Sequence, residues 1–125
     1  MVDEKNNGTE KHFIETWDQV EAYFLSLSWC EQMRELIAQL RLMGYDKVTR
    51  ADTSMSTLHL SRSITWREAR NNPQICFAVI SGKLVVTYYG RGTSSRSYKV
   101  SFDTIKINHE IKMLLRKIVA KPILE

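Results

Sequence analysis

The chain of 125 residues carries 18 Lys and Arg against 14 Asp and Glu, with 43% hydrophobic and 26% charged residues. Such a composition is typical of a soluble globular protein, and the length predicts one domain with a sizeable core. No apolar run reaches the roughly 20 residues that a membrane-spanning helix needs. The first residues are polar and lack the apolar region of a signal peptide, so we expect a cytoplasmic protein.

Cysteine and histidine usage gives no sign of a metal site. Cys30 and Cys76 form no Cys-x-x-Cys pair, and each lies within an apolar stretch, which predicts two buried thiols in a reducing compartment. His12, His59 and His109 show no spacing typical of metal ligands. We therefore expect no metal and no cofactor. His59, on the outer face of a predicted strand, is the histidine that a site could include.

The N-terminal part of the chain predicts a tail followed by a helix. Residues 1–13 are rich in Asn, Glu and Lys without apolar periodicity, which predicts a disordered tail before a single α+β domain over residues 14–125. A capping box from Thr16 to Gln19 marks the expected start of the first helix. Its predicted buried stripe consists of Trp17, Val20, Phe24 and Leu27.

Two further capping boxes follow. The first, from Ser28 to Glu31, predicts a second helix at an angle to the first, and Gly44 provides its C-terminal stop. The second, from Thr65 to Glu68, predicts one or two helical turns or a loop. The predicted buried stripe of the second helix consists of Met33, Leu36, Ile37, Leu40 and Met43.

Residues 74–89 form the centre of the predicted sheet. Two runs rich in β-branched and aromatic residues flank a turn at Ser81-Gly82 or Gly82-Lys83, which is the pattern of a tight β-hairpin. Alternation gives the hairpin two faces. The bulky face, expected to be core, consists of Ile75, Phe77, Val79, Leu84, Val86 and Tyr88. The lighter face, expected to be covered in part by a helix or by another chain, consists of Cys76, Ala78, Ile80, Val85, Thr87 and Tyr89.

Other strands and a last helix surround this hairpin. Alternation predicts a strand over residues 47–51 paired with one over 56–61, with a polar turn over 51–54, and a further strand over 96–102. The last helix, capped by Asp103 or Asn108, has a stripe of Ile111, Leu114, Leu115 and Ile118. The order predicts an α+β fold: two N-terminal helices, a 4–5-stranded mainly antiparallel sheet with a central hairpin, and a C-terminal helix packed on one face.

Basic residues are concentrated in the strand half of the chain. Residues 1–61 carry 6 Lys and Arg against 10 Asp and Glu, a balance of −4, whereas residues 62–106 carry 8 against 2, a balance of +6. A segment of this charge attracts phosphate or an acidic partner. The candidate binding residues are Arg62, Trp66, Arg67, Arg70, Arg91 and Arg96. Trp66, between arginines and beside a loop, is the aromatic residue that we expect to be exposed.

The sequence contains no phosphate loop, no Gly-x-Ser-x-Gly and no His-Glu-x-x-His, so it gives no reason to expect an enzyme. We expect a small non-enzymatic binding or regulatory module that contacts an acidic protein surface, or another copy of itself, through the basic segment. The alternative is binding of RNA or another single strand. In that case the arginines would pair with phosphates, and Trp66 and Tyr89 would stack on bases.

Overall fold

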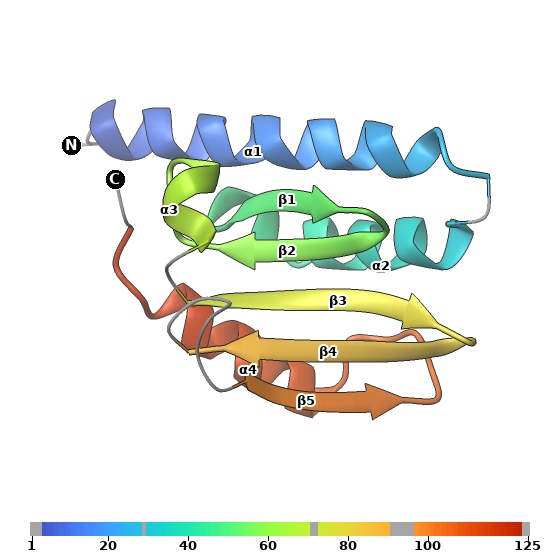
Figure 1. Ribbon diagram of the computed structural model, residues 1–125. Coiled ribbons are helices and arrows are strands. Elements are labelled where there is room, and N and C mark those ends of the chain that lie inside the picture. Colours follow the sequence, from blue (N-terminus) through green and yellow to red (C-terminus); the bar gives the residue numbers. More distant parts are fainter. Residues whose placement is uncertain (1–3, 29, 71–72, 91–96, 124–125) are drawn as a thin grey trace.

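The structure is a computed structural model, and it describes residues 4–28, 30–70, 73–90 and 97–123. Within these ranges the chain forms a five-stranded sheet with helices before, within and after it (Figure 1). In chain order the elements are α1 (Glu4–Leu25), α2 (Glu31–Leu42), the 3-10 helix η1 (Tyr45–Lys47), β1 (Arg50–Ser54), β2 (Thr57–Ser61), α3 (Trp66–Arg70), β3 (Gln74–Ile80), β4 (Lys83–Tyr89), β5 (Ser97–Phe102) and α4 (His109–Val119). This order confirms the predicted α+β fold.

The sheet is an antiparallel meander in the order β1-β2-β3-β4-β5. Its centre is the predicted hairpin of β3 and β4, which pairs Ile80 with Lys83 around a Ser81-Gly82 turn. Both turn residues have positive φ angles, +53° and +77°, as two-residue hairpin turns with the sheet's own twist require. The hairpin therefore presents the two faces that alternation predicts.

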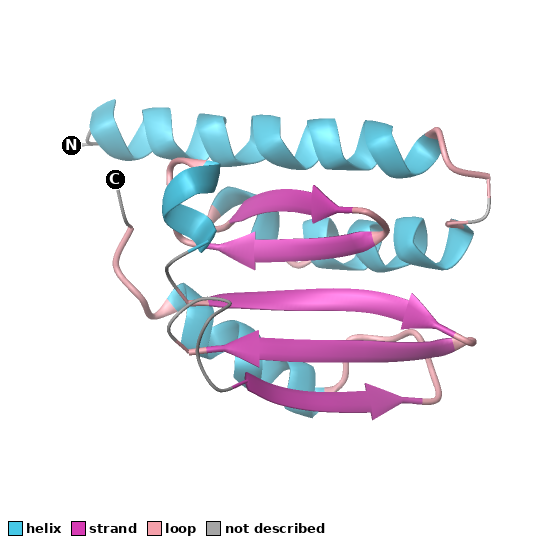
Figure 2. Ribbon diagram, viewed as in Figure 1, coloured by secondary structure: helices cyan, strands magenta, loops and turns pink. Residues whose placement is uncertain are grey.

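Helices cover one face of the sheet. In Figures 1 and 2, α2 and α4 lie behind the strands, and the side chains between them form the core. The bulky hairpin face lies in this core, where Ile75, Phe77, Leu84 and Val86 have no exposed surface. The predicted stripe of α4 is buried as well, and Asn108 caps that helix by accepting a hydrogen bond from the Ile111 N–H.

The long helix α1 runs along the outer edge of β1 (Figure 1). Thr16 accepts a hydrogen bond from the Ala51 N–H at 3.0 Å, and the Trp17 indole donates to the Thr49 carbonyl at 2.9 Å. These contacts satisfy backbone groups that an edge strand would otherwise leave unpaired.

Two predictions about the first half of the chain are wrong. α1 begins at Glu4, and Phe13 is fully buried, so residues 4–13 are no disordered tail; residues 1–3 lie outside the described part. Contacts with distant residues hold this segment, and local composition does not reveal them. One is His12 Nε2, which lies 2.8 Å from the Ile64 carbonyl oxygen. The polar turn expected over residues 51–54 is strand β1 instead.

The capping predictions have mixed outcomes. Thr65 caps α3 by accepting from the Glu68 N–H, as predicted. α2 begins after Cys30 rather than after Ser28, without a side-chain cap. Gly44 follows α2 in the left-handed conformation, with φ at +88°, which agrees with its predicted role as the stop.

Candidate functional site

The second face of the sheet is open over most of its extent. Among the described elements only α3 crosses it, at one end (Figure 1). Strand register places a row of side chains across this open face, and each member lies opposite the next: Asp52, His59, Cys76, Thr87 and Lys99. A carboxylate, an imidazole, a thiol, a hydroxyl and an ammonium group therefore follow one another across all five strands.

A cluster of three polar side chains lies at the centre of this row. Cys76 Sγ is 2.9 Å from His59 Nδ1, and the same nitrogen is 3.0 Å from Gln74 Oε1. The Gln74 amide group also donates to the Ala69 carbonyl at 3.1 Å, which ties the cluster to α3. Sequence analysis singled out His59, but it did not identify Gln74 as its partner.

Burial decides the ionisation state of the thiol. Cys76 is only 6% exposed, and desolvation raises its pKa to about 12. At neutral pH the thiol is therefore protonated in spite of the neighbouring imidazole, and it is a poor nucleophile. Both cysteines are buried and free, as predicted.

Two hollows meet at His59. One, with a volume of about 230 Å³, lies over the middle of the open face and includes Cys76, Ala78, Val85 and Lys99 in its lining. The other, of about 140 Å³, lies between β1, β2 and α3 and is lined by Asp52, Ser54, His59, Ser61, Trp66, Ala69 and Gln74. The open face therefore offers two recesses, each lined by both polar and apolar side chains.

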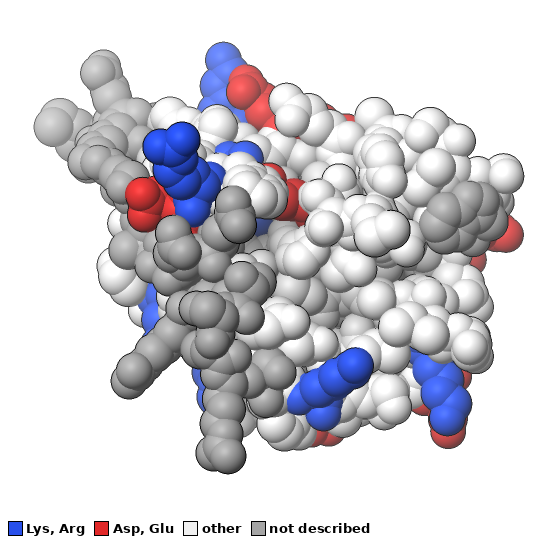
Figure 3. Space-filling view, viewed as in Figure 1, with Lys and Arg blue, Asp and Glu red and all other residues white. Residues whose placement is uncertain are grey.

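The predicted basic residues are distributed unevenly around these hollows. Trp66 is exposed, as predicted, with 47% of its surface accessible, and Arg67 beside it on α3 is exposed too. Figure 3 shows basic side chains at this end of the face and along its lower edge, with a largely uncharged surface between them. Arg91 and Arg96 lie outside the described residues, as does the side chain of Arg70.

Arg62 points into the fold rather than to a partner. Its guanidinium group donates to the Lys121 carbonyl at 3.0 Å and to the Val48 carbonyl at 2.6 Å. Partial burial lowers its pKa from the ordinary value. The side chain thus joins the end of β2 to the segment after α4 and to the segment before β1, and two of its five N–H donors serve the fold.

The described ranges show neither a metal-binding cluster nor a membrane-spanning helix. No three His, Cys, Asp or Glu side chains are grouped there so that they could hold a metal ion. Nor does any helix in those ranges combine the length and the apolar character needed to cross a membrane.

Comparisons with known proteins add no family to this description. Neither the protein-family models, nor the curated proteins, nor the solved structures gave a match to this chain. The geometry of the open face therefore carries the functional argument.

Proposed function

We propose that this protein is a small cytoplasmic binding module, without a catalytic role, that uses the open face of its sheet to contact another protein or a second copy of itself. The observation that supports this proposal is the bare face itself, which no described helix covers except at the α3 end. The two free cysteines are in keeping with a reducing cytoplasm.

The composition of the open face suits a protein interface. Ala78 and Val85 are only partly exposed, whereas Ile80 is 54% exposed at the end of β3. This partly apolar surface lies beside the smaller hollow that Trp66 lines, and Arg67 is exposed next to Trp66 on α3. Aromatic residues and arginine dominate binding hot spots, so this combination suits an interface.

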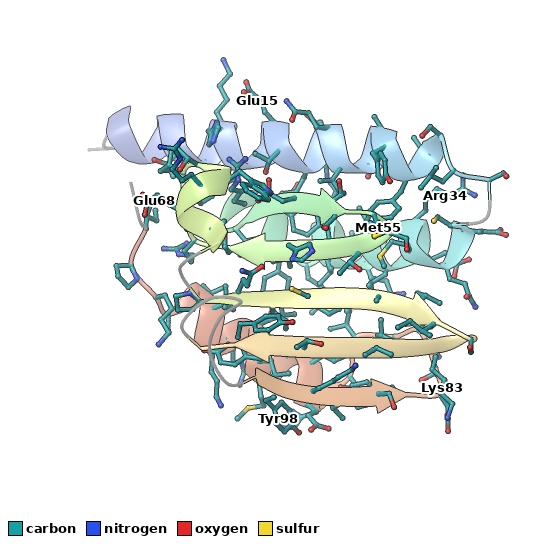
Figure 4. All side chains as sticks on the ribbon, in the orientation of Figure 1. Glu15, Arg34, Met55, Glu68, Lys83 and Tyr98 are labelled. Atoms are coloured by element: carbon teal, nitrogen blue, oxygen red, sulfur yellow. The ribbon has the colours of Figure 1, made fainter. Side chains whose placement is uncertain are left out.

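Charge favours an acidic partner surface for this interface. Lys99 lines the larger hollow of the open face, Arg67 is exposed on α3, and the first half of the chain carries the net negative balance. α1 presents exposed carboxylates, among them Glu15, away from the sheet (Figure 4). A second copy could therefore supply the acidic surface through its α1. In this proposal Arg62 serves the fold rather than the partner.

The proposal is tested by measuring self-association in sedimentation experiments over a concentration series, and by measuring binding to an immobilised polyglutamate peptide. Val85→Arg places a bulky charge in the larger hollow, and Arg67→Glu with Lys99→Glu reverses two positive charges of the proposed interface. We expect each variant to weaken association at least tenfold, and added salt to weaken the charge-dependent part. The matched control is Lys112→Glu with Arg116→Glu on the exposed side of α4. Equal effects of the interface and control pairs, or no association in either assay, would rule out the open face as the interface.

A second candidate partner is a single-stranded nucleic acid. The observation in its favour is the half-exposed Trp66 ring beside Arg67, with Tyr89 and Lys99 lining the larger hollow of the same face. Fluorescence anisotropy with a labelled oligonucleotide discriminates the two candidates. A steep linear fall of log affinity with log salt concentration, together with loss of binding in Trp66→Ala, would favour nucleic acid over protein.

A further inference from the structure

The hydrogen bonds around His59 fix which of its ring nitrogens carries the proton. The Gln74 amide donates through Nε2 to the Ala69 carbonyl, so its oxygen, Oε1, must be the atom facing His59 Nδ1. A carbonyl oxygen only accepts hydrogen bonds, and therefore Nδ1 bears the hydrogen. In the neutral ring the other nitrogen, Nε2, then has a lone pair and no hydrogen.

No described residue donates a hydrogen bond to this lone pair. Among the described residues, His59 Nε2 is enclosed without a hydrogen-bond donor near it. Leaving a buried acceptor unsatisfied is destabilising, and native proteins retain few such atoms without a reason. The cysteine offers no relief, because its sulfur lies on the opposite nitrogen, Nδ1.

The His59 ring lines the smaller hollow, and several other lining side chains can accept hydrogen bonds. Asp52 lies opposite His59 in the strand register and lines the same hollow, together with the hydroxyl groups of Ser54 and Ser61. No Lys or Arg is present among the described residues of this lining. Arg50 pairs with one Asp52 oxygen, Oδ2, at 2.9 Å, from outside the lining. The Trp66 ring forms an aromatic wall.

A ligand that suits this hollow donates several hydrogen bonds, is attracted to the Asp52 carboxylate and presents a flat face to an indole ring. The guanidinium group meets all three requirements, since it has five N–H donors in a rigid plane and stacks on aromatic rings. A volume of about 140 Å³ accommodates such a head group but no large molecule. Because Nε2 has no contact with solvent, a lining side chain must rotate to admit the ligand, and Trp66 is the large exposed residue of the lining.

We propose that the hollow between β1, β2 and α3 is a recognition pocket for the guanidinium group of an arginine side chain on the protein partner. His59 Nε2 and the Asp52 carboxylate accept its hydrogen bonds, and Trp66 covers its face. This inference rests on the proposed function, because it supplies the anchor that a partner would insert into the open face. It also assigns a role to the Nε2 lone pair of His59.

The test is a titration of the ¹⁵N-labelled protein, followed by NMR, with N-acetyl-arginine methylamide. Matched probes are the corresponding derivatives of citrulline, which has the same shape without the charge, and of lysine, which has the charge without the planar fork. We expect the arginine probe to shift the Trp66 indole and His59 ring signals with a Kd on the order of 1 mM. The citrulline and lysine probes should bind at least fivefold more weakly.

Substitutions of lining residues, compared with a control on another element, test whether the arginine probe binds in the pocket. His59→Phe removes the lone pair and Trp66→Leu removes the ring, and each should weaken arginine binding at least fivefold. His109→Phe, at an exposed histidine of α4, is the control that should have no effect. Thermal unfolding verifies that each variant is folded. A variant that fails to fold is replaced by Asp52→Asn, which should weaken binding by a similar factor.

The outcomes are distinguishable from failure of the proposed function. Val85→Arg disrupts the proposed interface outside the pocket lining, so it should abolish association and leave probe binding intact. Lack of saturable shifts up to about 20 mM arginine probe would overturn the pocket even if association is observed. Equal binding of the lysine or the citrulline probe would overturn the assignment to guanidinium.

Discussion

The pKa of the Cys76 thiol depends strongly on the surroundings of the side chain. On an exposed strand it would ionise near pH 9.0, but on the open face it is enclosed by its neighbours and its pKa rises to about 12. The proton therefore leaves far more readily from the unfolded chain than from the folded one. Stability and pH are linked through this difference.

We expect this linkage to appear between pH 8 and pH 10. Below pH 9 both states retain the Cys76 proton, and above it only the unfolded state loses it, so stability falls as the pH rises. At pH 10 the loss from this group is about 1.4 kcal/mol. Urea unfolding of the wild type and of Cys76→Ala measures it, because the free-energy difference between the two proteins should shrink by that amount. Thr87→Ala, at the register partner of Cys76, should show a difference that does not change with pH.

Among the elements, α1 departs furthest from what the sequence predicts. Its first turns belong to the domain because Phe13 is buried against the fold and His12 reaches the Ile64 carbonyl. These contacts join residues some fifty positions apart. No local pattern in the first 13 residues indicates them.

Substitution of Phe13 tests this anchoring. We expect Phe13→Ala to reduce the free energy of unfolding by about 3 kcal/mol, as for other buried phenylalanines, and Lys11→Ala, on the exposed side of the same helix, to change it by less than about 0.5 kcal/mol. Chemical denaturation of the two variants provides the measurement. Similar small effects of both substitutions would show that the N-terminal turns of α1 contribute nothing to the domain.

Elements with a strong apolar period were predictable, and those held by distant partners were not. The stripe of α4 and both faces of the β3–β4 hairpin follow directly from alternation and helical spacing. The strand that pairs with β2 was predicted over residues 47–51, whereas β1 spans Arg50–Ser54, because its residues are polar and much of its support comes from α1 through Thr16.

For the site, His59 and Cys76 could each be assigned to an outer face, but their 2.9 Å contact depends on the register between β2 and β3. Arg62 is basic like its neighbours, and only the tertiary structure shows that it bonds carbonyl groups of the fold.

At the scale of the whole molecule, the sheet has two unequal faces. One is sealed by α2 and α4, and the other is largely bare of described helices. Phe77 and Ala78 are neighbours on β3 that point to opposite sides, so they sample the two environments at one place in the chain.

The two environments predict different costs of substitution. Phe77→Ala should lower the free energy of unfolding by about 3–5 kcal/mol because it creates a cavity in the core, whereas Ala78→Ser should lower it by less than about 1 kcal/mol. Denaturant unfolding at low protein concentration measures both without the contribution of association. Equally severe losses at the two positions would mean that the second face is as thoroughly covered as the first.

The meander order of the strands has a kinetic consequence. Every hydrogen-bonded strand pair consists of neighbours in the sequence, so each pairing closes a short loop at a small cost in entropy. Folding speed increases with the share of such local contacts, and we expect this sheet to form faster than one with crossover connections. The slower steps are the docking of α1 on β1 and of α4 behind β3. If the sheet forms before α2 and α4 dock, the apolar side chains of its covered face, such as Phe77 and Val86, remain in contact with water until those helices close over them.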